Sequence, residues 1–277
     1  MLTRQRRSLQ SSDALAVARA LAADPVSSCM VAARVEAFGI EPRWLGGQLW
    51  SADDPEYSLC YSGANLVPVV GDEADLDYFA ETALAGPREC SSLVGPAHLA
   101  LGLWERLEPT WGPAREVRAV QQLMALPGDP QIEADPEVRL VTRADLDLYF
   151  PAAVEMFTAE IGLDPRAPDG GRLYRNRLAG LIDAGRVFAR FDGDRVVFKA
   201  EIGAMSHAVG QIQGVWVDPR FRSVGVGKAG TAAVASAIRA HGRTPSLYVN
   251  DFNTTARAAY AAVGFEQVGT FATVLID

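Results

Sequence analysis

The segment Gln213-Gly-Val-Trp-Val-Asp-Pro-Arg-Phe-Arg-Ser-Val-Gly-Val-Gly-Lys228 is the most informative part of this 277-residue chain. It predicts an apolar strand that ends at Val217, a turn at Asp218-Pro219, a basic glycine-bearing loop, and a helix that continues to Ala240. Such a loop gathers free backbone N–H groups at a helix N-terminus, which favours a phosphate anion. Neither a P-loop pattern nor G-x-G-x-x-G after a first strand is present, so a nucleotide-hydrolysing or dinucleotide-binding site is disfavoured.

The rest of the second half alternates between strand and helix patterns around this segment. Strands at 138–141, 186–191, 195–205, 209–217, 246–249, 265–267 and 271–276 are expected, with helices at 145–161, 171–184 and 254–263 in addition to the one that ends at Ala240. The turn Asp192-Gly-Asp194 is a hairpin signal between two of these strands.

The first half repeats almost the same order of elements. Helices are expected near 12–23, 28–38, 73–85 and 97–107, and strands near 43–50, 57–62, 65–70, 90–94 and 116–125. Apart from a missing first strand the order matches that of the second half, which indicates an internal duplication. The seam Leu126–Pro136 holds three prolines and three acidic residues. We therefore predict an N-terminal domain at 1–126, a linker at 127–136 and a second domain at 137–277.

Composition limits the classes of function. The chain is 49% hydrophobic and 22% charged, as in globular proteins, and its net charge of −8 disfavours a nucleic-acid binder. No run is long and apolar enough for a membrane span, and no signal peptide is visible, so a cytoplasmic location is expected. Three cysteines and three histidines show no metal-ligand spacing, so no metal site is predicted.

Two motifs in order resemble a known superfamily. Arg222-Ser-Val-Gly225-Val-Gly227 resembles the acyl-coenzyme A signature R/Q-x-x-G-x-G/A of the GNAT N-acetyltransferases, and it follows the V-x-P strand end at Val217-Asp-Pro219. Downstream, Asn253-Thr-Thr-Ala-Arg-Ala-Ala-Tyr260, closed by Gly264-Phe265, is similar to the superfamily's N-x-x-A-x-x-x-Y helix. The resemblance covers residues 138–277 and implies an α/β fold with a mixed sheet. The chain would then hold two tandem GNAT-like halves, each a mostly antiparallel sheet flanked by helices.

The resemblance also implies a site. Two neighbouring strands would part to admit the pantetheine arm, Val215 and Val217 would offer backbone groups to it, and Ser223 through Lys228 would offer N–H groups to the pyrophosphate. Asn253 would touch the pantetheine, and Tyr260 would protonate the leaving thiolate. The implied acetyl-CoA-binding residues are Val215, Trp216, Val217, Arg222, Ser223, Val224, Gly225, Val226, Gly227, Lys228 and Asn253. Asn253 also suits a helix N-cap, and Tyr260 also suits a core aromatic.

A base must accept the proton of the attacking amine. Glu201, on the more polar face of strand 195–205, is the predicted catalytic base, although a surface ion pair with Lys199 or an arginine is the alternative. Glu160 and Asp251 are further candidates. Gln211 and Gln213 stand where some relatives carry a carboxylate, and glutamine cannot act as a base.

The first half lacks these motifs. Its corresponding strand runs into Gly71-Asp-Glu-Ala-Asp75, whose three acids would repel a pyrophosphate, so a degenerate copy is expected. The prediction is an acetyl-CoA-dependent N-acyltransferase that acts on a primary amine, a small molecule or a protein, in a ternary complex. The alternative is a non-catalytic acyl-CoA sensor. The segment Met156–Arg177 should line the acceptor site, and a homodimer is possible.

Overall fold

The computed structural model describes residues 9–277. Its contacts divide the chain into two compact units. Unit 1 comprises the described part of Met1–Met124 together with Tyr248–Asn253 and Gln267–Asp277, and unit 2 comprises Ala125–Leu247 and Thr254–Glu266. Each unit is described by itself.

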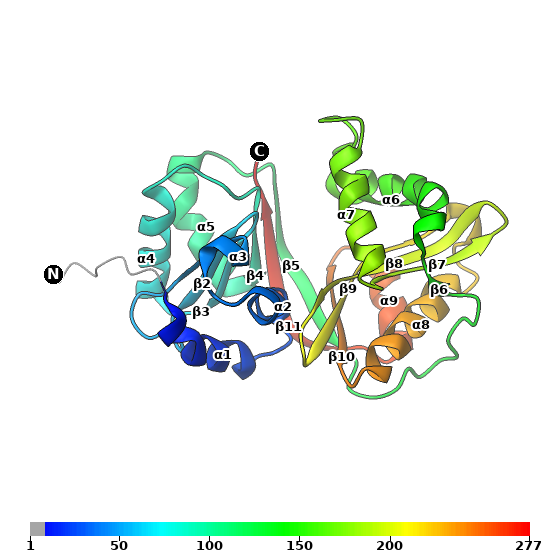
Figure 1. The fold of residues 1–277 in the computed structure, drawn as a ribbon, viewed down its shortest axis with the longest axis horizontal. Coiled ribbons are helices and arrows are strands. Elements are labelled where there is room, and N and C mark those ends of the chain that lie inside the picture. Colours follow the sequence, from blue (N-terminus) through cyan, green and yellow to red (C-terminus); the bar gives the residue numbers. More distant parts are fainter. Residues whose placement is uncertain (1–8) are drawn as a thin grey trace. The chain divides into compact units, whose positions relative to one another are not determined.

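Unit 2 is a sheet covered by helices on both faces, as Figure 1 shows. Its strands lie in the order β10-β9-β8-β7-β6, antiparallel except for the parallel pair β10 and β9. The strands are β6 (Arg139–Leu140), β7 (Val187–Asp192), β8 (Arg195–Met205), β9 (Val209–Val217) and β10 (Thr244–Asn250), the last of which continues into unit 1; the helices are α6 (Leu146–Ile161), α7 (Arg172–Asp183), α8 (Val226–Ala240) and α9 (Thr254–Val263).

Alternation along β8 explains the two layers of unit 2. Phe198 faces α8, where a Cβ on Gly230 would lie 2.7 Å from its ring. Lys199 and Glu201 face the opposite side, toward Tyr149 of α6. The core on that side contains side chains from α6, α7, β7 and β9, among them Trp216. The polar side chains of β8, Lys199 and Glu201, thus lie beneath α6 and α7.

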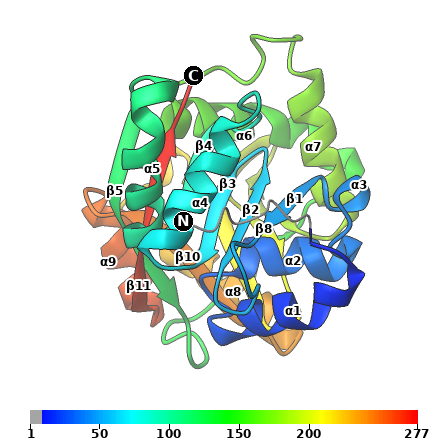
Figure 2. The ribbon, with the colours of Figure 1, turned by 90° about the vertical axis from the view of Figure 1, so that its left-hand side faces the viewer.

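Unit 1 has the same kind of layering. Its strands lie in the order β1-β2-β3-β4-β11-β5. Helices α1 and α2 pack on one face of this sheet, and α4 and α5 pack on the other (Figure 2). The helices are α1 (Ala14–Ala23), α2 (Cys29–Phe38), α3 (Pro42–Leu45), α4 (Glu73–Leu84) and α5 (Ala97–Trp111); the strands are β1 (Gly47–Trp50), β2 (Leu59–Gly63), β3 (Leu66–Val70), β4 (Ser92–Pro96), β5 (Glu116–Ala125) and β11 (Glu266–Leu275).

Three local expectations differ from the structure. Residues 42–45 form the short helix α3 rather than the start of a strand, because Pro42 suits the first turn of a helix and Gly46 ends it in a left-handed conformation. The two strands expected at 265–267 and 271–276 are one continuous strand, β11. Helix α5 extends to Trp111 and includes Pro109, beyond the expected end near 107.

The C-terminal strand and the acidic seam add detail to the predicted domain division. β11 pairs antiparallel with β4 from Phe271 opposite Pro96 to Leu275 opposite Ser92, so the last strand of the chain groups with unit 1. Residues 127–136 form neither helix nor strand. This stretch nevertheless packs on unit 2, where the Gln131 N–H donates to Val263 and the Asp135 N–H donates to Ala229.

Across residues 9–277, no helix combines the length and the apolar character that crossing a membrane requires.

Candidate functional site

Strand β9 carries a bulge in its middle. Lys199 of β8 pairs with Trp216, but Glu201 pairs with Gln213, so two residues of β9, Gly214 and Val215, stand opposite Ala200 alone. Gly214 has φ = +57°, a conformation that glycine adopts without strain. A Cβ at Gly214 would lie 2.9 Å from the end of the Met156 side chain, which can move, so it is the backbone angle that favours glycine here.

Beyond its first residues, β9 has an open edge within unit 2. Its parallel pairing with β10 covers only Thr244–Ser246, opposite Val209–Gln211. On the other edge the Asp218 N–H donates to the Val197 carbonyl at 3.0 Å. Because backbone groups alternate between the two edges of a strand, those of Val215 and Val217 point away from β8. Within unit 2 the two strands therefore part as the resemblance implied, and this leaves the Val215 backbone and the Val217 N–H without a strand partner there.

Trp216 lies differently from its neighbours. By the same alternation its backbone faces β8, and its indole is only 9% exposed in the core beneath α6 and α7. The geometry gives Trp216 a packing role and no group on the open edge.

The loop after β9 turns sharply into α8. Asp218 accepts a hydrogen bond from the Arg220 N–H, which begins a short 3-10 turn at Pro219–Phe221. The Arg222 Nε donates to the Val217 carbonyl at 3.0 Å, while the rest of this side chain is exposed. Ser223, with φ = +64°, is the one non-glycine residue with positive φ among residues 9–277. Left-handed backbone at a non-glycine residue costs free energy and is frequent where a loop is shaped for function.

The N-terminus of α8 follows from this loop. Gly225, at φ = +95°, is the N-cap and supplies no side chain to cover the first turn. The first N–H groups of any helix have no partner within the helix, so those of Val226, Gly227 and Lys228 are available to an anion. A Cβ on Gly227 would lie 3.2 Å from Val217 Cγ2, which shows how closely α8 approaches β9. Val224 and Lys228 are both exposed beside this turn.

A buried charged cluster lies beneath the bulge, on the α6 and α7 side. The side chains of Lys199 and Glu201 are 0% and 1% exposed and form an ion pair of 2.9 Å. Tyr149 donates to the same oxygen of Glu201, Oε1, at 3.1 Å. Arg177 and Gln213 each donate to the other oxygen, Oε2, at 3.4 Å. The surface ion pair considered for Glu201 is thus a fully buried one.

This environment determines the protonation of Glu201. Burial by itself would raise the pKa of the carboxyl, but the charges of Lys199 and Arg177 and the hydrogen bonds that the carboxylate accepts hold the pKa below its ordinary value. Burial lowers the pKa of Lys199, and Glu201 opposes that shift. A carboxylate with a lowered pKa and four donors is a weak proton acceptor.

Tyr260 is buried on α9. Its ring is 9% exposed and packs edge-on against Phe265 with the ring centroids 6.2 Å apart. Within residues 9–277 its hydroxyl has no hydrogen-bond partner. Burial, with a smaller contribution from the charge of Glu160, raises the pKa of Tyr260 above its ordinary value of about 10, so the hydroxyl keeps its proton at neutral pH.

The remaining predicted residues lie apart from the bulge. Glu160 is exposed near the end of α6, and its charge acts on Tyr260, Tyr174 and Lys199. Asn253 and Asp251 belong to unit 1, on the exposed turn before α9. There the Asn253 N–H donates to the Asn250 carbonyl, and Gln122 donates to the Asp251 carboxylate.

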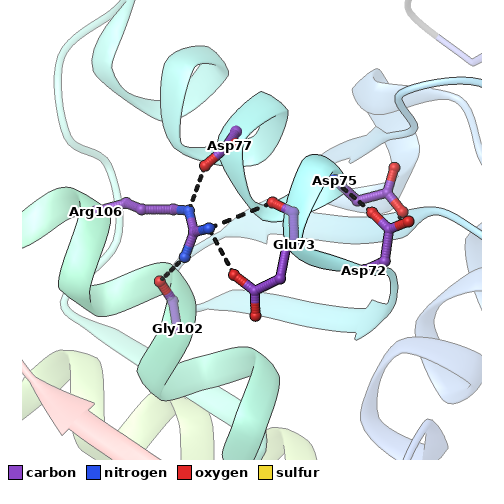
Figure 3. Close-up of polar contacts among 6 residues, drawn as sticks. All are labelled: Asp72, Glu73, Asp75, Asp77, Gly102 and Arg106. Atoms are coloured by element: carbon purple, nitrogen blue, oxygen red, sulfur yellow. Dashed lines mark hydrogen bonds and ion pairs between the residues drawn. The ribbon is translucent and has the colours of Figure 1, made fainter.

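The corresponding helix of unit 1, α4, is closed to anions by its own carboxylates (Figure 3). The Asp75 N–H donates to Asp72 Oδ1, and the Asp72 N–H donates to Asp75 Oδ2, both at 3.0 Å. Glu73 on the first turn and Asp77 on the second turn pair with Arg106 of α5. This reciprocal capping occupies the N–H groups that a phosphate would need and surrounds them with negative charge.

Strand β3 of unit 1 differs from β9 in its residues at the corresponding edge. Pro68 has no N–H to donate, and Gly95 of β4 is so close that a Cβ there would lie 2.9 Å from the Pro68 carbonyl oxygen. In unit 1 the helix N-terminus is therefore capped, and the strand before it carries a proline.

The Lys199–Glu201 pair was expected only as a surface pair, and its burial with Tyr149, Arg177 and Gln213 was not predicted from the sequence. Two signals were present: Gly214 interrupts an apolar strand, as glycines at bulges do, and Lys199 lies inside a strand whose neighbours are apolar.

Two family models match parts of the chain. Residues 197–274 match the model described as "FR47-like protein", and residues 47–149 match a domain of unknown function, DUF4081. No curated protein matches the chain in sequence.

Several solved structures share the fold over the whole chain. A Drosophila protein superposes with a TM-score of 0.66 at 12% identity, covering 99% of each chain. A GNAT-family acetyltransferase from Colwellia psychrerythraea superposes with a TM-score of 0.59 at 11% identity, covering 99% of this chain and 100% of its own. A GCN5-related N-acetyltransferase from Sphaerobacter thermophilus superposes with a TM-score of 0.56 at 16% identity, covering 98% and 94%. The resemblance in fold thus extends to both halves.

Proposed function

We propose that this chain, a two-part protein with the GNAT acetyltransferase fold, is an acetyl-CoA-dependent N-acyltransferase whose single active site lies in unit 2. The observation that carries the proposal is the continuous cradle formed by the open edge of β9, the Arg222 loop and the uncapped N-terminus of α8. It presents backbone groups to an extended amide-bearing arm and N–H groups to a pyrophosphate.

Different residues of the site would bind different parts of acetyl-CoA. Val215 and Val217 would bind the acyl and pantetheine amides, residues 223–228 would bind the pyrophosphate, and Arg222 would add positive charge. Arg222 is also tied to Val217, so the loop and the strand edge are held together.

The chemistry would be direct transfer. The amine nitrogen attacks the thioester carbonyl carbon, the carbon–sulfur bond breaks, and the departing thiolate takes the proton of the Tyr260 hydroxyl. Burial keeps the Tyr260 hydroxyl protonated, so a proton is available to the thiolate, although the raised pKa makes Tyr260 a weaker acid than an ordinary tyrosine. No cysteine lies in unit 2, since Cys29, Cys60 and Cys90 are buried in unit 1, which argues against a cysteine acyl-enzyme.

Glu160 is better placed than Glu201 to accept the amine proton. Glu160 is exposed and acts electrostatically on Tyr260, whereas the Glu201 carboxylate is enclosed by four donors. The acceptor is a primary amine, carried by a small molecule or a protein. The protein is expected to act in the cytoplasm.

Binding and turnover measurements test the proposal together. Calorimetry should show that acetyl-CoA binds, and a panel of primary amines should include one that releases free coenzyme A thiol. Arg222→Glu should weaken binding about 10-fold to 100-fold, the scale of a lost charge-assisted contact. Arg195→Glu, an exposed charge reversal on the β7–β8 hairpin, is the matched control and should leave affinity unchanged.

The results separate the enzyme from the alternative, an acyl-CoA sensor. Tight binding without turnover for any amine would favour the sensor. Equal loss of affinity in both charge-reversal variants would remove the Arg222 loop from the site, and absence of binding in the wild type would refute both functions.

A further inference from the structure

The buried pair Lys199–Glu201 has no role in the transfer chemistry as proposed. Both side chains are fully buried and lie against Tyr149 of α6. Burying two charges is costly even when they pair, and well-packed apolar residues are often equally stable in their place. A structural role limited to stability is therefore a weak explanation for this pair.

The position of the Lys199–Glu201 pair offers a better explanation. A Cβ on Gly214 would lie 3.2 Å from Lys199 Nζ, so the ammonium group lies directly against the bulge backbone. The ammonium lies 5.4 Å from the Tyr149 ring centroid, and Glu201 Oε1 accepts from both Lys199 and Tyr149. Lys199 is thus held on three sides by Tyr149, Glu201 and the Gly214 backbone.

The second oxygen of Glu201 connects this support to both neighbouring layers. Gln213, which precedes Gly214 in β9, and Arg177 of α7 both donate to Oε2. The network therefore spans β8, the residue that precedes the bulge in β9, and the two covering helices. Each member fixes the orientation of another, which is how a buried polar network specifies one backbone conformation.

We propose that Lys199 and Glu201 are positioning residues that hold the Gly214–Val215 bulge in the shape that binds the acyl thioester. The inference rests on the proposed function, because it assigns the pair to the acyl end of that site. Lys199 contributes a buried positive charge under the strand edge where negative charge would develop on the thioester oxygen. Glu201 keeps the ammonium in place and does not itself exchange a proton with substrate.

The discriminating measurement compares two ligands that differ only at the acyl group. Acetyl-CoA and free coenzyme A would share the pyrophosphate contacts at α8. Only acetyl-CoA has a thioester carbonyl to place at the bulge. The double variant Lys199→Met/Glu201→Gln removes both charges together, so no unpaired buried charge remains. We expect it to fold, to bind coenzyme A within about twofold of wild type, and to lose at least about 10-fold in both its preference for acetyl-CoA and kcat.

A matched control removes an ion pair elsewhere in unit 2. Arg143→Met/Asp183→Asn deletes an exposed pair between the start of the α6 region and the end of α7 and should change neither ratio nor rate. As a second test, Glu201→Gln alone keeps the side-chain shape and should lower the acetyl-CoA preference in the same direction. Melting curves are recorded for every variant.

Each outcome is decisive. A folded double variant with the wild-type acetyl-CoA preference and kcat would overturn the positioning role while leaving the proposed function intact. If both Glu201 variants fail to fold, the pair serves stability, and the inference is overturned. A wild type that binds neither ligand would refute the proposed function and this inference with it.

Discussion

At the residue scale, Tyr260 offers the sharpest test of catalysis. Its ring is packed, but within the described residues its hydroxyl has no hydrogen-bond partner, so packing does not require the oxygen. Tyr260→Phe should therefore keep the melting temperature and the affinity for acetyl-CoA. It should lower the single-turnover rate by roughly 100-fold if the hydroxyl protonates the thiolate.

The control for this prediction is a packed tyrosine of unit 1. Tyr61 donates a hydrogen bond to the Gly46 carbonyl, so Tyr61→Phe should lower stability by about 1 kcal/mol and leave the chemical step nearly unchanged. A Tyr260→Phe rate within threefold of wild type at every pH would assign Tyr260 to packing. The raised pKa of Tyr260 also predicts that no loss of activity from its ionisation occurs below pH of about 10.

At the scale of elements, the contact between α8 and β9 controls the width of the cradle. Gly227 is so close to Val217 that Gly227→Val must push the first turn of α8 away from the strand edge. The N–H groups would then no longer converge on the pyrophosphate, and affinities for acetyl-CoA and coenzyme A should fall together by about 10-fold or more. Isothermal titration with both ligands measures this.

Gly180 provides the comparison for Gly227. It lies inside α7, and a Cβ there would meet no atom within 4 Å, so Gly180→Ala should stabilise the helix by up to about 1 kcal/mol and leave binding unchanged. If Gly227→Val binds as tightly as the wild type, α8 does not hold the pyrophosphate.

At the scale of the whole molecule, the two halves share a fold but differ in their helix N-termini. α8 begins uncapped after Gly225, whereas α4 is capped reciprocally by Asp72 and Asp75. We therefore expect one acetyl-CoA site per chain, measured as a stoichiometry of one by titration. Arg222→Glu should weaken that single site without revealing a second one. A titration with two equivalent sites would show that unit 1 is not degenerate.

Local patterns in the sequence predicted most of the helices and strands of this protein. Most helices and strands lie within a few residues of their expected ranges, because apolar periodicity, caps and glycine stops act over neighbouring residues. The strand, loop and helix from Gln213 to Lys228 were predicted for the same reason. The acids that follow Gly71 also indicated that the N-terminus of α4 would not bind an anion. The capping that occupies it is a contact between residues three apart in the sequence.

Contacts between residues far apart in the sequence determined the burial of the charged residues and the pairing of the strands. Glu201 was predicted as a base on a polar strand face, but only the packing of α6 and α7 encloses it with Tyr149 and Arg177, 52 and 24 residues away. The grouping of β11 with unit 1 depends on its pairing with β4, which lies far back in the chain. Burial and strand pairing are properties of the assembled structure, because they depend on which remote segments exclude water from a group or satisfy its hydrogen bonds.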